Sequence, residues 1–275
     1  MRELRNNIKI AVNDLSVSYN DEGKTGDPVI IFIHGFPFNK SMWDKQMESL
    51  KHGYRVIAYD VRGHGGSDTG TEDFSIELFA TDLLNLMDTL KIDKAMLCGL
   101  SMGGYIALNA VENYPDRFDA LILSDTTCLA DTSEAKEKRI KTIENIRKNG
   151  VEKFADESIK NLFARESFST KKNEIAAVRE MIVHTEEESL CKTLRAFYER
   201  KETCSKLSDI YVPVLIMVGE EDKITPLAAA QLMQEKIKDS LLSIMEHAGH
   251  LINIENPLEF NNQLEEFVST VYYYG

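Results

Sequence analysis

The sequence of 275 residues contains no long uninterrupted run of apolar side chains, and its first ten residues, MRELRNNIKI, have no apolar centre. A helix that crosses a bilayer needs about 20 consecutive apolar residues, and a secretory signal needs a shorter apolar stretch behind a basic start. We therefore expect neither element in these residues, and we expect a cytoplasmic protein.

Positive charge is also scarce, because 32 Lys and Arg stand against 45 Asp and Glu and the net charge is −13. The longest basic stretch, KEKR at 136–139, is interrupted by acid and has the spacing of a solvated helix face. A chain of this charge repels the phosphates of nucleic acids and of anionic membranes. We therefore expect no nucleic-acid or membrane partner, and a small molecule remains as the expected partner.

Cysteine is rare and shows no pairing pattern. No CxxC pair is present, and no cysteine has a histidine at metal-ligand spacing. Disulfide frameworks and zinc sites usually show such patterns, so we predict reduced thiols, no metal site and no cofactor. The four cysteines are Cys98, Cys128, Cys191 and Cys204.

Short apolar runs alternate with amphipathic stretches along most of the chain. Apolar runs without polar alternation are typical of strands that are buried on both faces, and apolar residues three and four apart indicate helices. The alternation predicts an α/β fold, a mainly parallel twisted sheet with helices on both faces. Strands are predicted at 29–33, 55–59, 95–98, 120–123, 212–218 and 241–245, an antiparallel hairpin at 8–19, and helices at 75–90, 102–113, 227–237 and 258–272.

The alternation stops between residues 126 and 207, where the sequence has no proline and only one glycine, Gly150. Helical periodicity continues through this segment. It holds 17 basic and 15 acidic residues, so the rest of the chain carries a net charge of −15. We predict a core formed by residues 1–125 and 208–275, and a helical insertion at 126–207.

The stretch GLSMG at 99–103 has the pattern G-x-S-x-G and lies between a predicted strand and a predicted helix. In that context a sharp turn holds the serine in a strained backbone conformation and leaves room only for small neighbours. The pattern therefore predicts that Ser101 is a nucleophile, rather than a serine that only caps a helix.

A serine hydroxyl needs a base to accept its proton, and the base needs an acid to orient it. His250 follows the last predicted strand, and Asp222 follows the strand before it. Both positions suit a site at one edge of an open sheet. By residue type alone, three neighbours in the same loops could take these roles instead: Glu220, Glu221 and His247.

The loop HGF at 34–36 also follows a predicted strand. We expect the backbone N–H groups of Phe36 and Met102 to converge on developing negative charge, which is the arrangement of an oxyanion hole. His34 is predicted to hydrogen-bond the loop backbone rather than to transfer protons. A structural role is also predicted for three polar side chains of a glycine-rich loop: Asp60, Arg62 and His64.

The sequence resembles the α/β-hydrolase superfamily in five stretches: HGF at 34–36, DVRGHGGSD at 60–68, GLSMGGY at 99–105, GEEDKITP at 219–226 and HAGHLINIENP at 247–257. Within it, HGFPFNKSMW, GLSMGGYIAL and LILSDT are most similar to small carboxylesterases and 3-oxoadipate enol-lactonases. The resemblance implies Ser101 as nucleophile, Asp222 as acid and His250 as base. It also implies that the insertion is a helical cap over the site. Some relatives carry the acid at the position of Asp125, which stays a lesser candidate for that role.

The resemblance and the predicted triad together imply a carboxylic ester hydrolase (carboxylesterase) that acts on short to medium acyl chains through an acyl-enzyme. Phe38, Trp43 and Tyr105 are predicted to line its pocket. Enol-lactone hydrolysis, carbon–carbon bond hydrolysis and peracid formation remain open on the same scaffold, and so does a slow-turnover binding protein. A lactone that bears a carboxylate requires a cation near the site. The cap offers Arg165, Arg179, Arg195 and Arg200.

Overall fold

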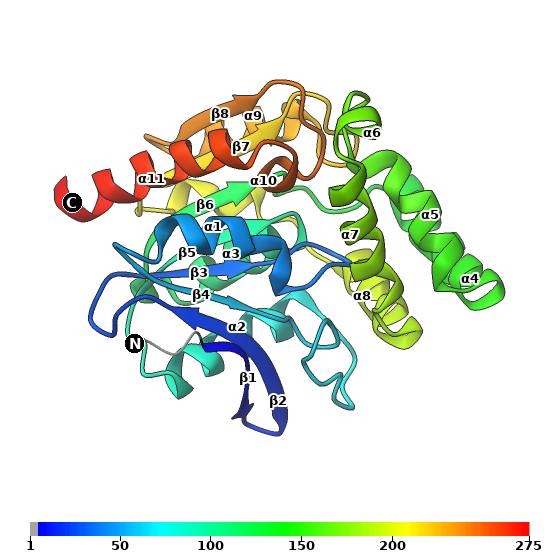
Figure 1. Cartoon of the computed structure of the whole chain (residues 1–275), viewed down its shortest axis with the longest axis horizontal. Helices are drawn as coiled ribbons and strands as arrows, with labels where there is room; N and C mark the ends of the chain where they lie inside the picture. The colour runs from blue at the N-terminus through cyan, green and yellow to red at the C-terminus, as the bar shows by residue number, and fades with distance from the viewer. Residues whose placement is uncertain (1–4, 275) are drawn as a thin grey trace.

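A computed structural model describes residues 5–274, and its centre is one eight-stranded sheet (Figure 1). The strands lie in the order β1-β2-β4-β3-β5-β6-β7-β8. β2 pairs antiparallel with β1 and with β4, and all other pairs are parallel. The predicted α/β fold with a mainly parallel sheet is confirmed. The strands are β1 (Arg5–Val12), β2 (Leu15–Glu22), β3 (Val29–Ile33), β4 (Arg55–Tyr59), β5 (Ala95–Leu100), β6 (Phe118–Ser124), β7 (Val214–Gly219) and β8 (Leu241–Met245).

The central strands are buried as their continuous apolar sequences predict. Every residue of β5 and β7 is buried, because helices cover both faces of the sheet there. β8 is different, since it forms the edge of the sheet and two of its large apolar side chains, Leu241 and Ile244, are exposed. The prediction of a strand at 241–245 is confirmed, but a fully buried strand is wrong at this position.

The helices of the core form two layers (Figure 1). α1 and α11 contact each other on one face of the sheet, and α2 and α3 contact each other on the opposite face. The four predicted helices are confirmed, whereas α1 was not predicted. Within residues 5–274, no helix combines the length and the apolar character that crossing a lipid bilayer requires. The core helices are α1 (Asp44–Leu50), α2 (Ile76–Thr89), α3 (Met102–Asn113), α9 (Leu227–Lys236), α10 (Ile252–Glu255) and α11 (Pro257–Tyr274).

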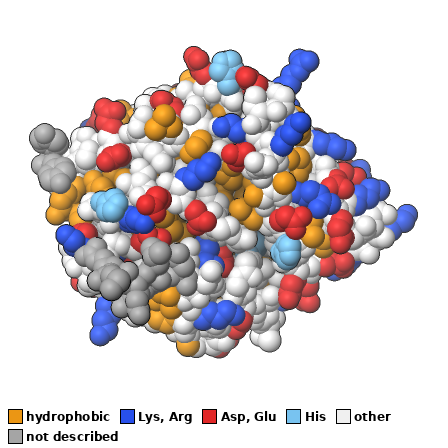
Figure 2. All heavy atoms as spheres, viewed as in Figure 1, with side chains coloured by type: hydrophobic (Ala, Val, Ile, Leu, Met, Phe, Trp, Pro, Cys, Tyr) orange, Lys and Arg blue, Asp and Glu red, His pale blue; other side chains and the backbone are white. Residues whose placement is uncertain are grey.

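The segment 126–207, called the cap segment below, forms five helices that lie beyond one end of the strands, at the right of Figure 1. Figure 2 shows cationic and anionic side chains intermixed over this part of the surface. The boundaries of the core and the cap stay a prediction, and residues 1–4 and 275 of the predicted core lie outside the described residues. The cap helices are α4 (Ser133–Asn149), α5 (Val151–Leu162), α6 (Ser167–Thr170), α7 (Lys172–Val183) and α8 (Glu187–Glu199).

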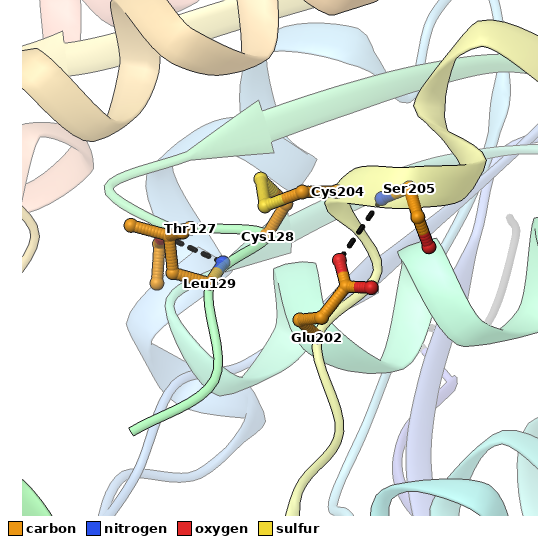
Figure 3. The surroundings of a disulfide bond; sticks show 6 residues. All are labelled: Thr127, Cys128, Leu129, Glu202, Cys204 and Ser205. Carbon is orange, nitrogen blue, oxygen red and sulfur yellow. Dashed lines mark hydrogen bonds between the residues drawn. A yellow bond between two sulfur atoms is a disulfide. The ribbon is translucent and has the colours of Figure 1, made fainter. Parts of the chain in front are cut away.

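Cys128 and Cys204 form a disulfide bond (Figure 3). The prediction of reduced thiols is wrong for this pair, although Cys98 and Cys191 are free and buried. Rules based on close spacing missed the bond because its two cysteines are 76 positions apart and meet only when the chain returns to the sheet. Disulfides persist mainly in oxidising surroundings. The disulfide therefore gives no support to the expected cytoplasmic location.

The disulfide lies where the cap segment leaves and rejoins the core. Cys128 follows β6, and Cys204 begins the short helix η3 (Cys204–Asp209), which precedes β7. The two Cα atoms are 4.8 Å apart. One covalent bond thus closes both ends of the cap segment into a loop.

Replacing both Cys128 and Cys204 by serine is expected to lower the free energy of unfolding by about 3–4 kcal/mol, because the bond restricts a long loop of the unfolded chain. Urea denaturation followed by circular dichroism measures this change. Wild-type protein held in a dithiol reductant should show the same loss, and Cys191→Ser serves as the control for losing a thiol outside any disulfide. An unchanged unfolding midpoint in the double variant would contradict the expectation.

Candidate active site

The loops that follow the parallel strands meet at one edge of the sheet, because the carboxyl ends of parallel strands point the same way. The strand order also reverses at this edge, where β3 and β5 lie side by side. The groups predicted for the site follow five different strands, and Met102 shares its strand with Ser101. Phe36 follows β3, Ser101 follows β5, Asp125 follows β6, Asp222 follows β7 and His250 follows β8.

Ser101 occupies the turn between β5 and α3 with φ 54° and ψ −110°. A residue with a side chain is strained at positive φ, and such strain persists only where the surroundings hold it. Here the N–H of Ser101 donates to the carbonyl of Ser124 at 2.9 Å, and the hydroxyl of Thr126 donates to the carbonyl of Ser101 at 2.8 Å. Hydrogen bonds therefore connect the turn to the end of the neighbouring strand β6 and to the loop that follows it.

The glycines around Ser101 are a steric requirement of this turn. A Cβ atom on Gly99 would lie 2.3 Å from the carbonyl oxygen of Gly103, and one on Gly103 would lie 2.1 Å from the carbonyl oxygen of Ile33. Backbone atoms at these distances cannot yield as a flexible side chain would. The need for small residues on both sides of the serine, predicted from the sequence, is confirmed.

His250 and Asp222 form a buried, hydrogen-bonded pair. Nδ1 of His250 lies 2.8 Å from Oδ2 of Asp222, and both side chains are almost fully buried. The carboxylate also accepts the hydroxyl of Thr225 at 2.7 Å and the N–H of Ile224 at 2.7 Å. An ionised carboxylate only accepts hydrogen bonds, so Nδ1 carries the proton and Nε2 is left as a base.

The surroundings of Asp222 favour its ionised form. Burial by itself would raise the pKa of Asp222, but the charge of a protonated His250 and the hydrogen bonds to this carboxylate outweigh burial and lower its pKa. Thr225 and Ile224 supply two of those bonds. The carboxylate is therefore kept charged and fixed in orientation beside the imidazole.

Asp125 has the opposite electrostatics. It is fully buried, and burial, followed by the nearby charge of Asp222, raises the pKa of Asp125 well above its ordinary value. Its carboxyl oxygens accept the N–H groups of Gly219 at 2.9 Å and Ile252 at 3.4 Å. Asp125 therefore connects its own loop after β6 to Gly219 at the end of β7 and to Ile252 at the start of α10. The imidazole of His250 is bonded to Asp222 and not to Asp125.

Glu220, Glu221 and His247, which residue type alone would also allow as acid or base, lie away from the pair. Glu220 and His247 are exposed, and the carboxylate of Glu221 accepts the N–H of Arg165 at 3.0 Å. Sequence patterns did not reveal Glu255, which is buried behind the loop of His250. Burial raises the pKa of Glu255, and its carboxyl accepts the N–H of Gly249.

The backbone N–H groups of Phe36 and Met102, predicted to form an oxyanion hole, have no acceptor within the described residues. Met102 is the first residue of α3, where an N–H has no partner within the helix. The N–H of Phe36 has no acceptor within residues 5–274. The loop of Phe36 is fixed by His34, whose Nδ1 lies 2.8 Å from the carbonyl of Gly35 and whose Nε2 accepts the N–H of Val61. The structural interpretation of His34 is confirmed, and burial lowers its pKa.

The glycine-rich loop after β4 is also structural, as predicted. Arg62 makes two hydrogen bonds of 2.7 Å to the carboxylate of Asp82, and Asp60 accepts the ammonium group of Lys40 at 2.7 Å. His64 is fully buried, and burial lowers its pKa to about 3. Internal hydrogen bonds thus engage Asp60 and Arg62, and Nδ1 of His64 lies 3.0 Å from the carbonyl of Arg62.

A cavity of about 470 Å³ lies between the core and the cap segment, and both Ser101 and His250 line it. Aromatic side chains form much of its wall: Phe36, Tyr105, Phe154 and Phe197. Tyr105 thus lines the cavity as predicted, whereas Phe38 and Trp43 are wrong as pocket residues. Both are fully buried in the core, where Trp43 packs against Phe32 with ring centroids 5.1 Å apart.

The cavity also has a cationic side that sequence reasoning missed. Lys138 and Arg139 of α4 and Lys223 of the Asp222 loop line it, against one carboxylate, Glu157. Lys138 and Arg139 belong to the stretch 136–139, which was predicted to be a solvated helix face. That prediction is wrong for these two residues, because α4 turns them toward the cavity. Among the four arginines offered from the sequence, Arg200 is buried behind Tyr105, and none belongs to the cavity lining.

No group of three or more His, Cys, Asp or Glu side chains that could hold a metal ion occurs in the described part of the chain. The site thus combines a serine in a strained turn with a histidine whose Nδ1 lies beside a buried carboxylate.

Comparison with known proteins identifies relatives of this chain. The chain is 28% identical over 256 residues to 3-oxoadipate enol-lactonase 2 of Acinetobacter baylyi, covering 93% of this chain and 94% of that protein. It is 30% identical over 258 residues to enol-lactonase 1 of the same organism, covering 94% of each.

Solved structures with the same fold include a thermophilic esterase from Thermogutta terrifontis, with TM-score 0.91 and 32% identity over 96% of this chain and 98% of that one. The enol-lactonase from Burkholderia xenovorans has TM-score 0.89 and 28% identity over 95% and 100% of the two chains. Residues 28–257 match the family model described as the alpha/beta hydrolase fold. The chain is therefore a member of the α/β-hydrolase family.

Proposed function

We propose that this α/β hydrolase cleaves short to medium carboxylic esters through an acyl-enzyme formed on Ser101. One observation carries the proposal. A serine in a strained turn shares a cavity with a histidine whose Nδ1 is bonded to a buried carboxylate. Its membership of a family whose relatives include an esterase and enol-lactonases supports the same reaction class.

The reaction follows from the groups that line the cavity. His250 accepts the proton of Ser101 as the hydroxyl attacks the ester carbonyl, and Asp222 stabilises the imidazolium that forms. The N–H groups of Phe36 and Met102 bind the oxyanion of the tetrahedral intermediate. His250 then protonates the departing alcohol, and afterwards it activates the water that releases the acid from Ser101.

Replacing Ser101 by alanine is expected to lower kcat for 4-nitrophenyl butyrate by about 10⁴-fold or more, because the acyl-enzyme can no longer form. Absorbance of released 4-nitrophenol measures turnover, and circular dichroism verifies the fold. Turnover retained in this variant would overturn the proposal. Tight ester binding with negligible turnover in the wild type would favour a binding protein instead.

A comparison of the two buried carboxyl groups tests the assignment of the acid. Asp222→Asn should lower kcat by about 10³–10⁴-fold, because the imidazole loses its acceptor and the correct tautomer. Asp125→Asn is the matched variant and should keep kcat within about threefold, because His250 is bonded to the other carboxylate. Equal losses in both variants would contradict the assignment.

A second candidate function is hydrolysis of a carboxylate-bearing lactone or ester, as the names of the enol-lactonase relatives suggest. The observation that favours it is the cationic side of the cavity, Lys138, Arg139 and Lys223. The guanidinium of Arg139 is held at 2.9 Å by Asp131, which fixes its position. A protein with a net charge of −13 repels anions in general, so this local cluster is the feature that would admit one.

Arg139→Gln should raise KM for 4-nitrophenyl hydrogen adipate by about tenfold or more, because a charge-assisted hydrogen bond is lost. KM for the neutral six-carbon ester, 4-nitrophenyl hexanoate, should change much less. Arg195→Gln, on the exposed surface of α8, is the control for removing one positive charge. A wild type that shows no preference between the two esters would exclude this second candidate.

A further inference from the structure

The chain passes between the core and the cap helices twice, and the two passages, residues 127–131 and 200–204, lie side by side. We call them the neck. The Cys128–Cys204 disulfide joins them (Figure 3), and the N–H of Thr203 donates to the carbonyl of Cys128 at 2.9 Å. The second passage is also braced locally, since Glu202 accepts the N–H of Ser205 at 2.9 Å.

A buried ion pair makes a second connection across the neck. A terminal nitrogen of Arg200 lies 3.5 Å from the carboxylate of Asp131, and the two side chains are 5% and 8% exposed. Nε of Arg200 is buried without an acceptor within the described residues. The position of this guanidinium therefore depends on few contacts, and the carboxylate of Asp131 is its charged partner.

Arg200 links the neck to the wall of the catalytic cavity. Its guanidinium carbon lies 3.9 Å from the centroid of the Tyr105 ring, which is the distance of a cation–π contact. Tyr105 stands one helical turn after Ser101 on α3 and lines the cavity. A shift of Arg200 therefore removes the support of a cavity wall beside the nucleophile.

Asp131 links the neck to the same cavity from the other side. It accepts a hydrogen bond of 2.9 Å from Arg139, whose guanidinium lies over the ring of Phe197, 5.1 Å from its centroid. Phe197 in turn packs edge-on against Tyr105 at 5.8 Å and against Phe36 at 5.3 Å. Contacts thus run without a gap from the neck to the aromatic wall.

We propose that the neck positions this wall, so that the Cys128–Cys204 disulfide sets the affinity of the cavity for substrate. The inference rests on the proposed ester hydrolysis at Ser101. Arg200 and Asp131 are positioning residues here, since they act through Tyr105 and Arg139. Opening the disulfide lets the two passages separate, and the part of the wall formed by Tyr105 and Phe197 then loses its fixed shape. The backbone of Phe36 stays fixed by His34, so the catalytic groups keep their geometry.

The catalytic groups keep their geometry because the cap has other attachments beside His250. The carboxyl of Glu255 accepts the N–H of Ala164 at 2.8 Å and the hydroxyl of Ser167 at 2.6 Å. The N–H of His250 donates to the carbonyl of Leu162 at 2.9 Å. These contacts do not involve the neck, so the cap stays attached near the imidazole when the disulfide opens.

The opening step is a thiol–disulfide exchange with a dithiol reductant such as dithiothreitol. One thiolate of the reductant attacks a sulfur of the disulfide and releases the first cysteine as a thiolate, which leaves a mixed disulfide. The second thiolate of the reductant then attacks the reductant's own sulfur in that mixed disulfide and releases the second cysteine. The protein gains two electrons and two protons as two thiols, and the dithiol becomes a cyclic disulfide. Air or an oxidised dithiol reverses the step.

The kinetic experiment compares oxidised and reduced wild type, with the state of the cysteines established by alkylation and mass spectrometry. We expect KM for 4-nitrophenyl butyrate to rise on the order of tenfold on reduction, with kcat changed by less than about twofold. Reoxidation should restore KM. Cys191→Ser should respond to reduction as the wild type does, because Cys191 lies outside the disulfide.

Variants locate the effect in the neck. The Cys128→Ser/Cys204→Ser protein should have the raised KM at all times and should not respond to reductant. Arg200→Gln should raise KM in the oxidised protein. Combining these changes should raise KM by less than the product of the separate effects, because both act on one set of contacts.

Hydrogen–deuterium exchange provides a readout that does not depend on turnover. Reduction should speed amide exchange at 131–139 and 197–204 and around Tyr105, and should leave Ser101, Met102 and the loop around His250 unchanged. The exchange measurement tests the inference even if the protein hydrolyses no ester. Absence of ester hydrolysis would overturn only the proposed function.

Three results would overturn the inference. The first is a reduced, folded protein with an unchanged KM, which would make the disulfide a stabilising bond only. The second is a lower KM after reduction, which would mean that the neck restricts access. The third is faster exchange confined to the neck itself, with the amides around Tyr105 unaffected.

Discussion

The turn between β5 and α3 is the constraint on which the rest of the site depends. It places a serine at positive φ, and the carbonyl of Ser124 and the hydroxyl of Thr126 hold it there. Because Gly99 and Gly103 have no Cβ, the helix begins directly above the end of the strand. The same turn places the N–H of Met102 directly after the serine, so the proposed nucleophile and one proposed oxyanion donor come from one turn.

Two buried carboxyl groups a short distance from this turn show how environment assigns roles to identical side chains. Asp222 receives hydrogen bonds from a hydroxyl, an N–H and an imidazole, and its pKa falls. Asp125 receives two N–H groups in a fully buried position next to another carboxylate, and its pKa rises. The negative charge is thus favoured on Asp222, which is bonded to the imidazole of His250, and disfavoured on Asp125, which is not.

In the proposed reaction, the cap segment contributes selectivity and the core contributes the reacting groups. Its charge is nearly balanced, whereas the core carries the excess of acid. It brings cationic and aromatic side chains to a cavity whose reactive groups all come from the core. Because the cap contacts Tyr105 and Phe36 directly, the shape of the cavity depends on how the cap is attached. The disulfide and the Asp131–Arg200 pair are two of those attachments.

The sequence by itself determined the strands, most core helices and the three residues of the predicted triad, because these depend on local patterns. Buried strands need continuous apolar runs, and the turn at Ser101 needs glycine at fixed offsets. Loops after parallel strands must meet at one edge. Tertiary structure alone decided the disulfide, the buried positions of Phe38 and Trp43, and the turn of Arg139 toward the cavity. Each of these depends on packing between segments far apart in the chain, which local spacing does not encode.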